Sequence, residues 1–148
     1  MRIQNKETSN IGGAKMTQED KQLLFIDLCG RLPYGVMIEV QNELGKLTSI
    51  NINDDGEVII YSSDCDEDAK IEYCKPYLRP ISSMTKEEEK EYYELYYDAP
   101  QFKNGWRDTR YLEGLHVDWF NRNHFDYRGL ISKGLAIKVT KENNPYKE

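Results

Sequence analysis

The fold is decided by the stretch VMIEVQNELGKLTSININDDGEVII, which covers residues 36–60. Apolar and polar residues alternate in three short runs within it, as expected of strands with one buried face. The residues expected to face the core are Val36, Ile38, Val40, Thr48, Ile50, Ile52, Val58 and Ile60. Between the runs lie residues 42–45 (NELG) and 53–56 (NDDG), whose composition is typical of tight hairpin turns. The stretch therefore predicts an antiparallel, three-stranded meander.

A helix is expected before the meander, over residues 18–29. Thr17, followed by Asp20, has the pattern of an N-cap, and Gly30 follows the apolar run. After the meander, residues 71–74 are a candidate fourth strand. Pro76 and Pro80 lie beyond it, and because neither can donate a backbone hydrogen bond, they predict an extended exit from the sheet.

The rest of the chain is expected to be mainly helical. Thr85 and Glu88 have the spacing of a capping box, which predicts a helix over residues 86–97. A second helix is expected from Asp108 to about residue 122. Its predicted apolar face consists of Tyr111, Leu112, Leu115 and Trp119.

After this helix, Asp126 is expected to cap a short helix over residues 127–133, and a last strand is expected over residues 135–139. The predicted fold class is α+β: an N-terminal helix, a small antiparallel β-meander or partly open barrel, and a helical C-terminal part that ends in a short strand. We expect a helix-plus-meander unit over residues 16–84, with residues 85–148 packed on it as one compact unit.

The composition is that of a folded domain. The chain has 148 residues, of which 39% are hydrophobic and 31% charged, enough for one core. Its longest uninterrupted apolar run, residues 23–26, is far shorter than the roughly 20 residues that cross a membrane. Residues 1–15 are polar and precede Met16. They are expected to be a flexible leader or an extension upstream of a second start codon.

The three cysteines are Cys29, Cys65 and Cys74. They are too few, and too irregularly spaced, for a disulfide framework. We therefore expect a reduced, cytoplasmic protein, with Cys29 as a small core residue.

Charge is distributed unevenly. Residues 36–84 contain 10 acids and 4 bases, a net charge of −6, whereas residues 99–141 contain 8 bases and 4 acids, a net charge of +4. Such a separation of charge along the chain bears on which partners the protein attracts, not on its fold. The second half is the better candidate for contacts with anions.

No metal or cofactor site is expected. Residues 64–68 (DCDED) have the D-x-D-x-D rhythm of a calcium loop, but Ala69 replaces its glycine and Lys75 its bidentate glutamate. A solvated acidic loop is the better interpretation. His116, at helical spacing between apolar residues, is interpreted as a packing histidine.

Basic and aromatic side chains interleave in the second half, which is typical of surfaces that contact proteins or nucleic acids. The candidate binding residues are Tyr92, Tyr96, Trp106, Arg107, Arg110, Arg122, His124, Tyr127 and Arg128. The alternative is that the aromatic residues belong to the core and the arginines pair with nearby aspartates at the surface.

Three segments carry a family resemblance: residues 28–35 (LCGRLPYG), 75–85 (KPYLRPISSMT) and 118–131 (DWFNRNHFDYRGLI). They resemble an uncharacterised family of short proteins from bacterial phages, prophages and mobile elements. The resemblance implies a phage or mobile-element context in a bacterial host, but no activity and no site residues. The meander is also similar in topology to Sm-like and SH3-like small barrels, although its net charge is opposite to that of a phosphate-binding barrel.

These observations lead to one principal hypothesis and two alternatives. The principal one is a non-enzymatic binding protein, an accessory factor that engages a host or phage protein; an inhibitor of bacterial defence fits this description. The first alternative is a nucleic-acid-binding module that uses residues 106–138. The second is a small hydrolase or nuclease around His124 and Asp126. No catalytic residue is assigned, because the sequence contains none of the common enzyme signatures.

Overall fold

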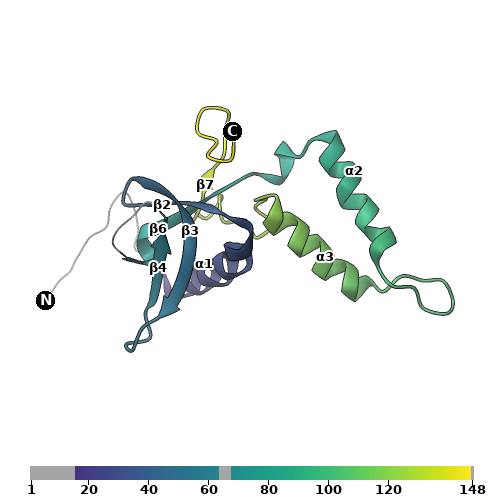
Figure 1. Cartoon of the computed structure of the whole chain (residues 1–148), viewed down its shortest axis with the longest axis horizontal. Coiled ribbons are helices and arrows are strands. Elements are labelled where there is room, and N and C mark those ends of the chain that lie inside the picture. Colours follow the sequence, from purple (N-terminus) through teal and green to yellow (C-terminus); the bar gives the residue numbers. More distant parts are fainter. Residues whose placement is uncertain (1–15, 64–67, 148) are drawn as a thin grey trace, which may run out of the picture.

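The computed structural model describes residues 16–63 and 68–147. The expected leader (1–15) and residues 64–67, which carry most of the acidic stretch compared with a calcium loop, lie outside the described residues. An N-terminal helix and an open sheet form a body, from which two further helices project (Figure 1). The helices are α1 (Gln18–Arg31), α2 (Lys86–Glu94) and α3 (Thr109–Arg122), and the strands are β2 (Met37–Val40), β3 (Glu43–Ile52), β4 (Val58–Ser62), β5 (Ala69–Lys70), β6 (Cys74–Leu78) and β7 (Ile137–Lys138).

The six strands form one sheet in the order β5-β4-β3-β2-β6-β7. All neighbours are antiparallel except β6 and β7, which are parallel. The predicted α+β class with an antiparallel meander is confirmed. The sheet is open, with β5 and β7 at its edges, rather than closed into a barrel.

The first hairpin turn lies earlier than predicted. Val40 pairs with Glu43, so the turn consists of Gln41 and Asn42 alone. Both have positive φ angles, 50° and 71°, as the favoured two-residue hairpin turns with right-handed twist require. Gly45 was predicted to belong to the turn but lies in β3, paired with Ile38.

A register shift in β3 corrects the predicted inward-facing set. The pairing with β4 shifts between Leu47 and Ser49, so Thr48 is the extra residue of a bulge. Leu47 is buried and Ile50 half-buried on the core side, whereas Thr48 is exposed. Ile52 keeps the side of Ile50 but is exposed, because it lies at the end of β3. A strict two-residue alternation cannot place the bulge, because one inserted residue exchanges the two faces.

The predicted position of the fourth strand, residues 71–74, is wrong. Residues Ile71–Tyr73 form a 3-10 turn, and β6 begins only at Cys74. Pro76 lies within β6, opposite Ile38, and is fully buried. The extended segment that the prolines predicted is thus itself a strand of the sheet.

The core lies between α1 and one face of the sheet. Leu24 and Leu28 of α1 are fully buried against Val36, Ile38 and other strand residues. The predicted N-cap of α1 is present, since the Thr17 side chain accepts a hydrogen bond from the Asp20 N–H (3.0 Å). Cys29 is exposed on α1 and is not the core residue that was expected.

The short helix expected over residues 127–133 is absent; the segment forms turns. Gly129 and Gly134 have positive φ angles (77° and 75°), which interrupt a right-handed helix. Asp126 still caps the segment, because its carboxylate accepts hydrogen bonds from the N–H groups of Leu130 (2.8 Å) and Ile131 (2.9 Å). The chain then returns to the body as β7.

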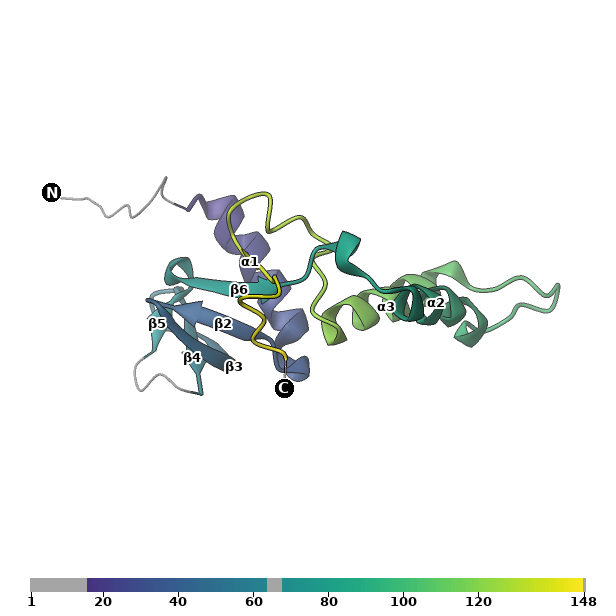
Figure 2. The same ribbon diagram turned by 90° about the horizontal axis from the view of Figure 1, so that it is seen from above.

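Residues 86–122, hereafter the arm, form a hairpin of α2 and α3 that extends away from the sheet (Figure 2). The two helices lie side by side, and the connecting loop forms the tip. In the part of the chain that the structure describes, no helix combines the length and apolar character needed to span a bilayer.

Candidate functional site

The base of the arm is fixed by Arg79 and Glu88. The predicted capping box at the start of α2 is present, with reciprocal hydrogen bonds between Thr85 and Glu88 (2.9 and 3.1 Å). The Glu88 carboxylate also accepts two hydrogen bonds of 2.7 Å from the Arg79 guanidinium, which hold the pKa of Glu88 below its ordinary value. The same guanidinium lies over the ring of Phe125, 4.1 Å from its centroid. The arm is thereby joined to the end of β6.

The two arm helices contact each other through aromatic rings. The ring of Tyr92 stacks on His116, with 4.1 Å between centroids, and contacts Trp119 and Phe120. The Trp119 indole N–H donates to Glu91 (3.3 Å). His116 is therefore the packing histidine that the sequence suggested. Yet α2 has no buried residue, and in α3 only Trp119 and Asn121 are buried.

The tip is an ordered turn that presents two large side chains. Phe102 accepts a backbone hydrogen bond from Gly105 (2.9 Å) and donates one to Trp106 (2.8 Å). Gly105 has a φ of 90°, where a side chain would be strained. The Trp106 N–H also donates to the Asn104 side chain (2.9 Å). Phe102 is 51% exposed and Trp106 73% exposed.

Arg107 stabilises the arm. Its guanidinium donates to the carbonyl oxygens of Tyr97 (3.2 Å) and Ala99 (2.8 Å), where the turn after α2 ends. It also lies 5.7 Å from the ring centroid of Tyr96. The group neutralises the negative end of this helical segment, as cations near helix C-termini do.

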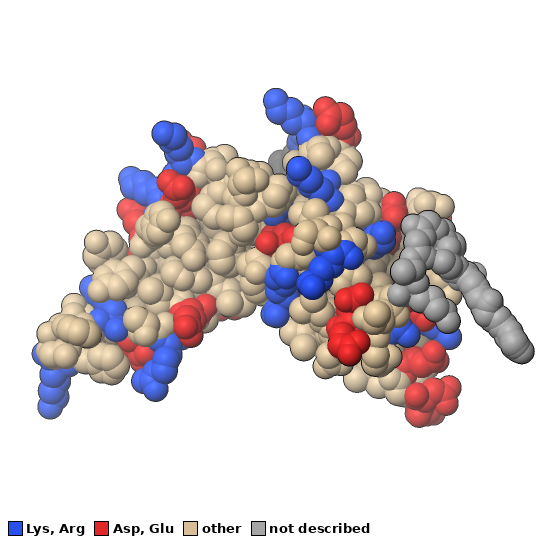
Figure 3. All heavy atoms as spheres, turned by 180° about the vertical axis from the view of Figure 1, so that it is seen from behind, with Lys and Arg blue, Asp and Glu red and all other residues tan. Residues whose placement is uncertain are grey.

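Exposed aromatic side chains concentrate on the arm. Among the described residues, six of the seven exposed large aromatic side chains belong to it, and only Tyr73 lies on the body. The six are Tyr93, Tyr96, Tyr97, Phe102, Trp106 and Tyr111. Seen from behind, a broad surface without Lys, Arg, Asp or Glu runs along the arm between charged side chains at its edges (Figure 3). We call the six side chains the arm aromatics.

A buried ion cluster lies where the arm meets the body. Asp27 and Arg31 of α1 are both fully buried and form two hydrogen bonds, of 2.7 and 3.1 Å. Arg31 also donates to the carbonyl oxygen of Phe125 (2.8 Å). Arg128 Nε lies 3.2 Å from Asp27 Oδ1, an ion pair by distance whose N–H is not aligned for a hydrogen bond. The cluster joins α1 to the segment that follows α3.

The helices α1 and α3 approach closely beside this cluster. A Cβ atom at Gly30 would lie only 3.1 Å from the side-chain nitrogen of Asn121, so the glycine permits the approach. The Arg31 Nη1 and Asn121 Oδ1 atoms are buried and have no hydrogen-bond partner among the described residues.

His124 lies in a desolvated position on the body. Its ring stacks on Tyr146, with 3.7 Å between centroids, and the Tyr146 hydroxyl donates to the Tyr77 carbonyl (2.7 Å) and accepts from the Met37 N–H (3.0 Å). Burial, together with the charges of Arg31 and Arg79, lowers the pKa of His124 to about 4. The ring is therefore neutral at neutral pH.

This pKa predicts a specific acid sensitivity. An unfolded histidine takes up its proton near pH 6.5, but folded His124 does so only near pH 4. Between these values the unfolded state binds more protons, so folding stability falls as the pH is lowered. From pH 7 to pH 4.5 we expect His124 to account for a loss of about 2 kcal/mol, discounted for partial exposure. The measurement is urea unfolding at both pH values.

The matched variant is His124→Asn, because Asn tolerates the positive φ of 65° at this position. It should lose less stability than the wild type over the same interval, since the titrating group is absent. An equal loss in both proteins would show that other groups cause the acid sensitivity.

The structure divides the predicted binding residues between two places. Tyr96, Trp106, Arg110 and Arg122 are exposed on the arm, whereas Tyr92 and Arg107 hold the arm together. The remaining three, His124, Tyr127 and Arg128, lie at the joint with the body. They do not form one surface.

Sequence reasoning missed other residues of both places. Phe102 and Tyr111 of the arm aromatics were not candidates, and Asp27, Arg31 and Tyr146 of the joint were not considered. A signal existed for Asp27 and Arg31: they occupy the same face of α1 as Leu24 and Leu28, so a buried pair could have been inferred.

The chain matches no protein-family model, and neither the curated proteins nor the solved structures contain a significant match to it. Within residues 16–63 and 68–147, no three His, Cys, Asp or Glu side chains are grouped so that they could hold a metal ion.

Proposed function

We propose that this protein is a non-enzymatic binding protein whose arm docks onto another protein. Two facts about the arm carry the proposal. No residue of α2 is buried, and the hairpin of α2 and α3 bears six exposed large aromatic side chains. Scattered apolar residues are normal on protein surfaces, but a concentration of them marks an interaction site.

The physics of a two-helix hairpin supports this proposal. A helix stabilises a fold by burying an apolar face. Here α2 and α3 pack against each other, and the end of α3 also packs on α1 near Asn121. The sheet does not cover the rest of the arm, which extends away from it (Figure 2). A partner that covers the arm aromatics would supply the missing layer. Tyr, Trp and Arg are also the residues that most often dominate interface energies.

The resemblance to phage and mobile-element proteins supports a more specific version. In that version the protein is an accessory factor in the bacterial cytoplasm, and the partner is a host or phage protein, such as a component of a bacterial defence system. The compact tip, with Phe102 and Trp106 held by backbone hydrogen bonds, suits insertion into a pocket of such a partner.

The nucleic-acid and hydrolase alternatives receive less support. The nucleic-acid alternative used residues 106–138, which contain six bases and four acids, a net charge of +2. The arm, to which about half of them belong, contains nine acids and six bases over residues 86–122, a net charge of −3, which is unfavourable for phosphate contacts. Arg107 is already engaged by carbonyl oxygens. The two residues of the hydrolase alternative are engaged in structural contacts. The Asp126 carboxylate accepts hydrogen bonds from two backbone N–H groups, and the His124 ring stacks on Tyr146.

The test is affinity capture from a bacterial lysate with the full chain as bait. We expect Trp106→Ala to weaken capture of the partner by more than tenfold, because truncating a central aromatic residue typically costs about 2 kcal/mol or more. Arg110→Ala should weaken capture less, since this side chain is 83% exposed and forms only a weak pair with Asp108.

Tyr73→Ala is the matched control, because Tyr73 is the exposed aromatic residue on the body. It should capture the partner as the wild type does. If no specific partner is captured, or if the three variants behave alike, the arm is not the docking surface.

A further inference from the structure

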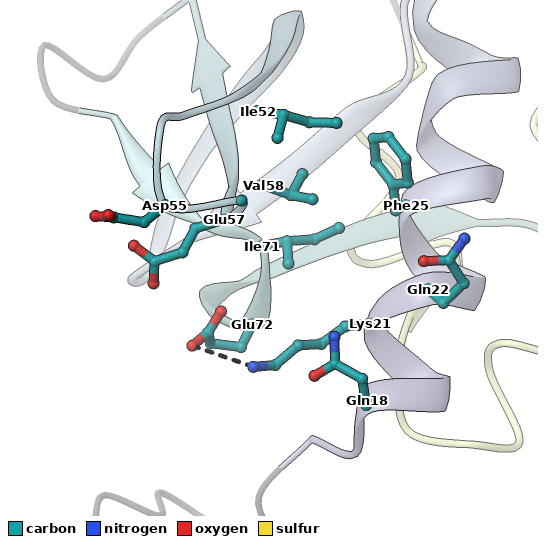
Figure 4. A pocket seen from close by; sticks show the side chains of 11 residues that line it. Gln18, Lys21, Gln22, Phe25, Ile52, Asp55, Glu57, Val58, Ile71 and Glu72 are labelled. Carbon is teal, nitrogen blue, oxygen red and sulfur yellow. Dashed lines mark ion pairs between the residues drawn. The ribbon is translucent and has the colours of Figure 1, made fainter.

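A hollow lies on the body, away from the arm. It is a cavity of about 370 Å³ between α1, the turn that joins β3 to β4, and the 3-10 turn before β6 (Figure 4). This volume lies within the range of small-ligand sites. Its walls are formed by residues distant in the sequence, so no single motif could have indicated it.

The inner walls of the cavity are apolar. Ile71 is almost fully buried at its base, and Phe25 and Val58 are half-buried beside it. Ile52 lies opposite Phe25 and is 55% exposed. The Phe25 ring points into the space between α1 and the hairpin (Figure 4). Among the described residues, no Lys or Arg lies over this ring, and an aromatic face is a favourable contact for a cation.

The mouth is lined by more acids than bases. Asp55, Glu57 and Glu72 are among the residues that line the cavity, and Lys21 is the only basic one among its described lining residues. The ammonium group of Lys21 is 3.8 Å from Glu72, a long pair. Lys70 lies outside the lining and pairs with Glu57 at 3.0 Å.

The partners of Glu57 and Asp55 differ. Hydrogen bonds from Lys70 and Asn53 lower the pKa of Glu57, so it is ionised at neutral pH. Asp55 pairs with no cation among the described residues. Asp55 thus adds to the rim of the cavity a carboxylate that has no cation partner among the described residues.

We propose that this cavity binds an organic cation carried on an apolar stem. This is the chemistry of an arginine or lysine side chain in a peptide, and also of free alkylguanidines and alkylamines. The stem would contact Phe25, Val58 and Ile71, while the cationic head would lie near Asp55 and Glu72. The carboxylates would repel an anion, and a neutral ligand could not form an ion pair with them.

The test is an NMR titration of the full chain with n-butylguanidinium, with n-butylurea as the neutral isostere. The cation should shift the amide signals of Gly56 and Ile71, and it should bind about fivefold to tenfold more tightly than the urea, as expected of one or two surface ion pairs. Binding should weaken as salt is added. Equal affinity for the two ligands would overturn the proposal.

Variants distinguish binding in the cavity from non-specific attraction of a cation to the acidic surface of the body. Asp55→Asn combined with Glu72→Gln should remove the preference for the cation, whereas Asp54→Asn, an exposed neighbour that does not line the cavity, should keep it. An unchanged preference in the double variant, or its loss in Asp54→Asn, would contradict the assignment. A Gly-Arg-Gly peptide that binds more tightly than butylguanidinium would identify a peptide as the source; equal affinity would identify the free cation.

Discussion

Replacement of Asp27 by Ala should lower the free energy of unfolding by about 3–5 kcal/mol, because it leaves a buried guanidinium without its counter-ion. Arg31 is fully buried, and its guanidinium donates two hydrogen bonds, of 2.7 and 3.1 Å, to the Asp27 carboxylate. This loss is comparable with the whole stability of a marginal domain. The measurement is urea unfolding at pH 7, followed by circular dichroism.

The control for this prediction is Glu19→Ala, which removes an exposed carboxylate from the first turn of the same helix. It should cost less than about 1 kcal/mol. The double variant Asp27→Leu/Arg31→Met should be more stable than Asp27→Ala, because replacing both charges leaves neither unpaired. If Asp27→Ala costs no more than Glu19→Ala, the ion cluster does not stabilise the joint.

Replacement of Phe125 by Ala is expected to cost a similar amount, about 3–5 kcal/mol, through the cavity it creates. The ring is fully buried, stacks on Trp119 with 5.5 Å between centroids, and lies under the Arg79 guanidinium. Because these neighbours belong to α3 and to the end of β6, the variant should also loosen the arm. Hydrogen exchange of α2 and α3 amides should accelerate more than that of the sheet.

Phe102→Ala is the corresponding control at the tip, where the same side chain is half exposed. Its cost should stay below about 1 kcal/mol, with exchange in α3 unchanged. A Phe125→Ala protein as stable as Phe102→Ala would show that the arm is held by other contacts.

The parts of the fold that depend on neighbouring residues could be predicted from the sequence. The Thr17 cap and the Thr85 capping box are local hydrogen-bond patterns, and the structure contains both. The bulge at Thr48 was missed because its signal is a change of register with a strand elsewhere in the chain. The helix expected over residues 127–133 is absent because Gly129 within it and Gly134 directly after it adopt left-handed conformations, which composition alone does not reveal.

The candidate site was predicted only in part, because it depends on contacts between residues that are distant in the sequence. Basic and aromatic residues indicated the region that forms the arm, but sequence spacing cannot show which side chains point outward. Tyr92 and Tyr93 are adjacent, yet one stacks on His116 and the other is 65% exposed. The partner of Arg31 at the joint, the Phe125 carbonyl, is 94 residues away. Such contacts exist only in the folded chain.

Photo-crosslinking from the arm tests most directly whether the arm docks onto another protein. A photoreactive phenylalanine analogue placed at position 106 of the full chain should crosslink to one partner protein in a bacterial lysate, because the Trp106 side chain is the most exposed of the arm aromatics. The same analogue at position 73, on the body, should not. Crosslinking from position 73 but not from position 106 would contradict a docking surface on the arm.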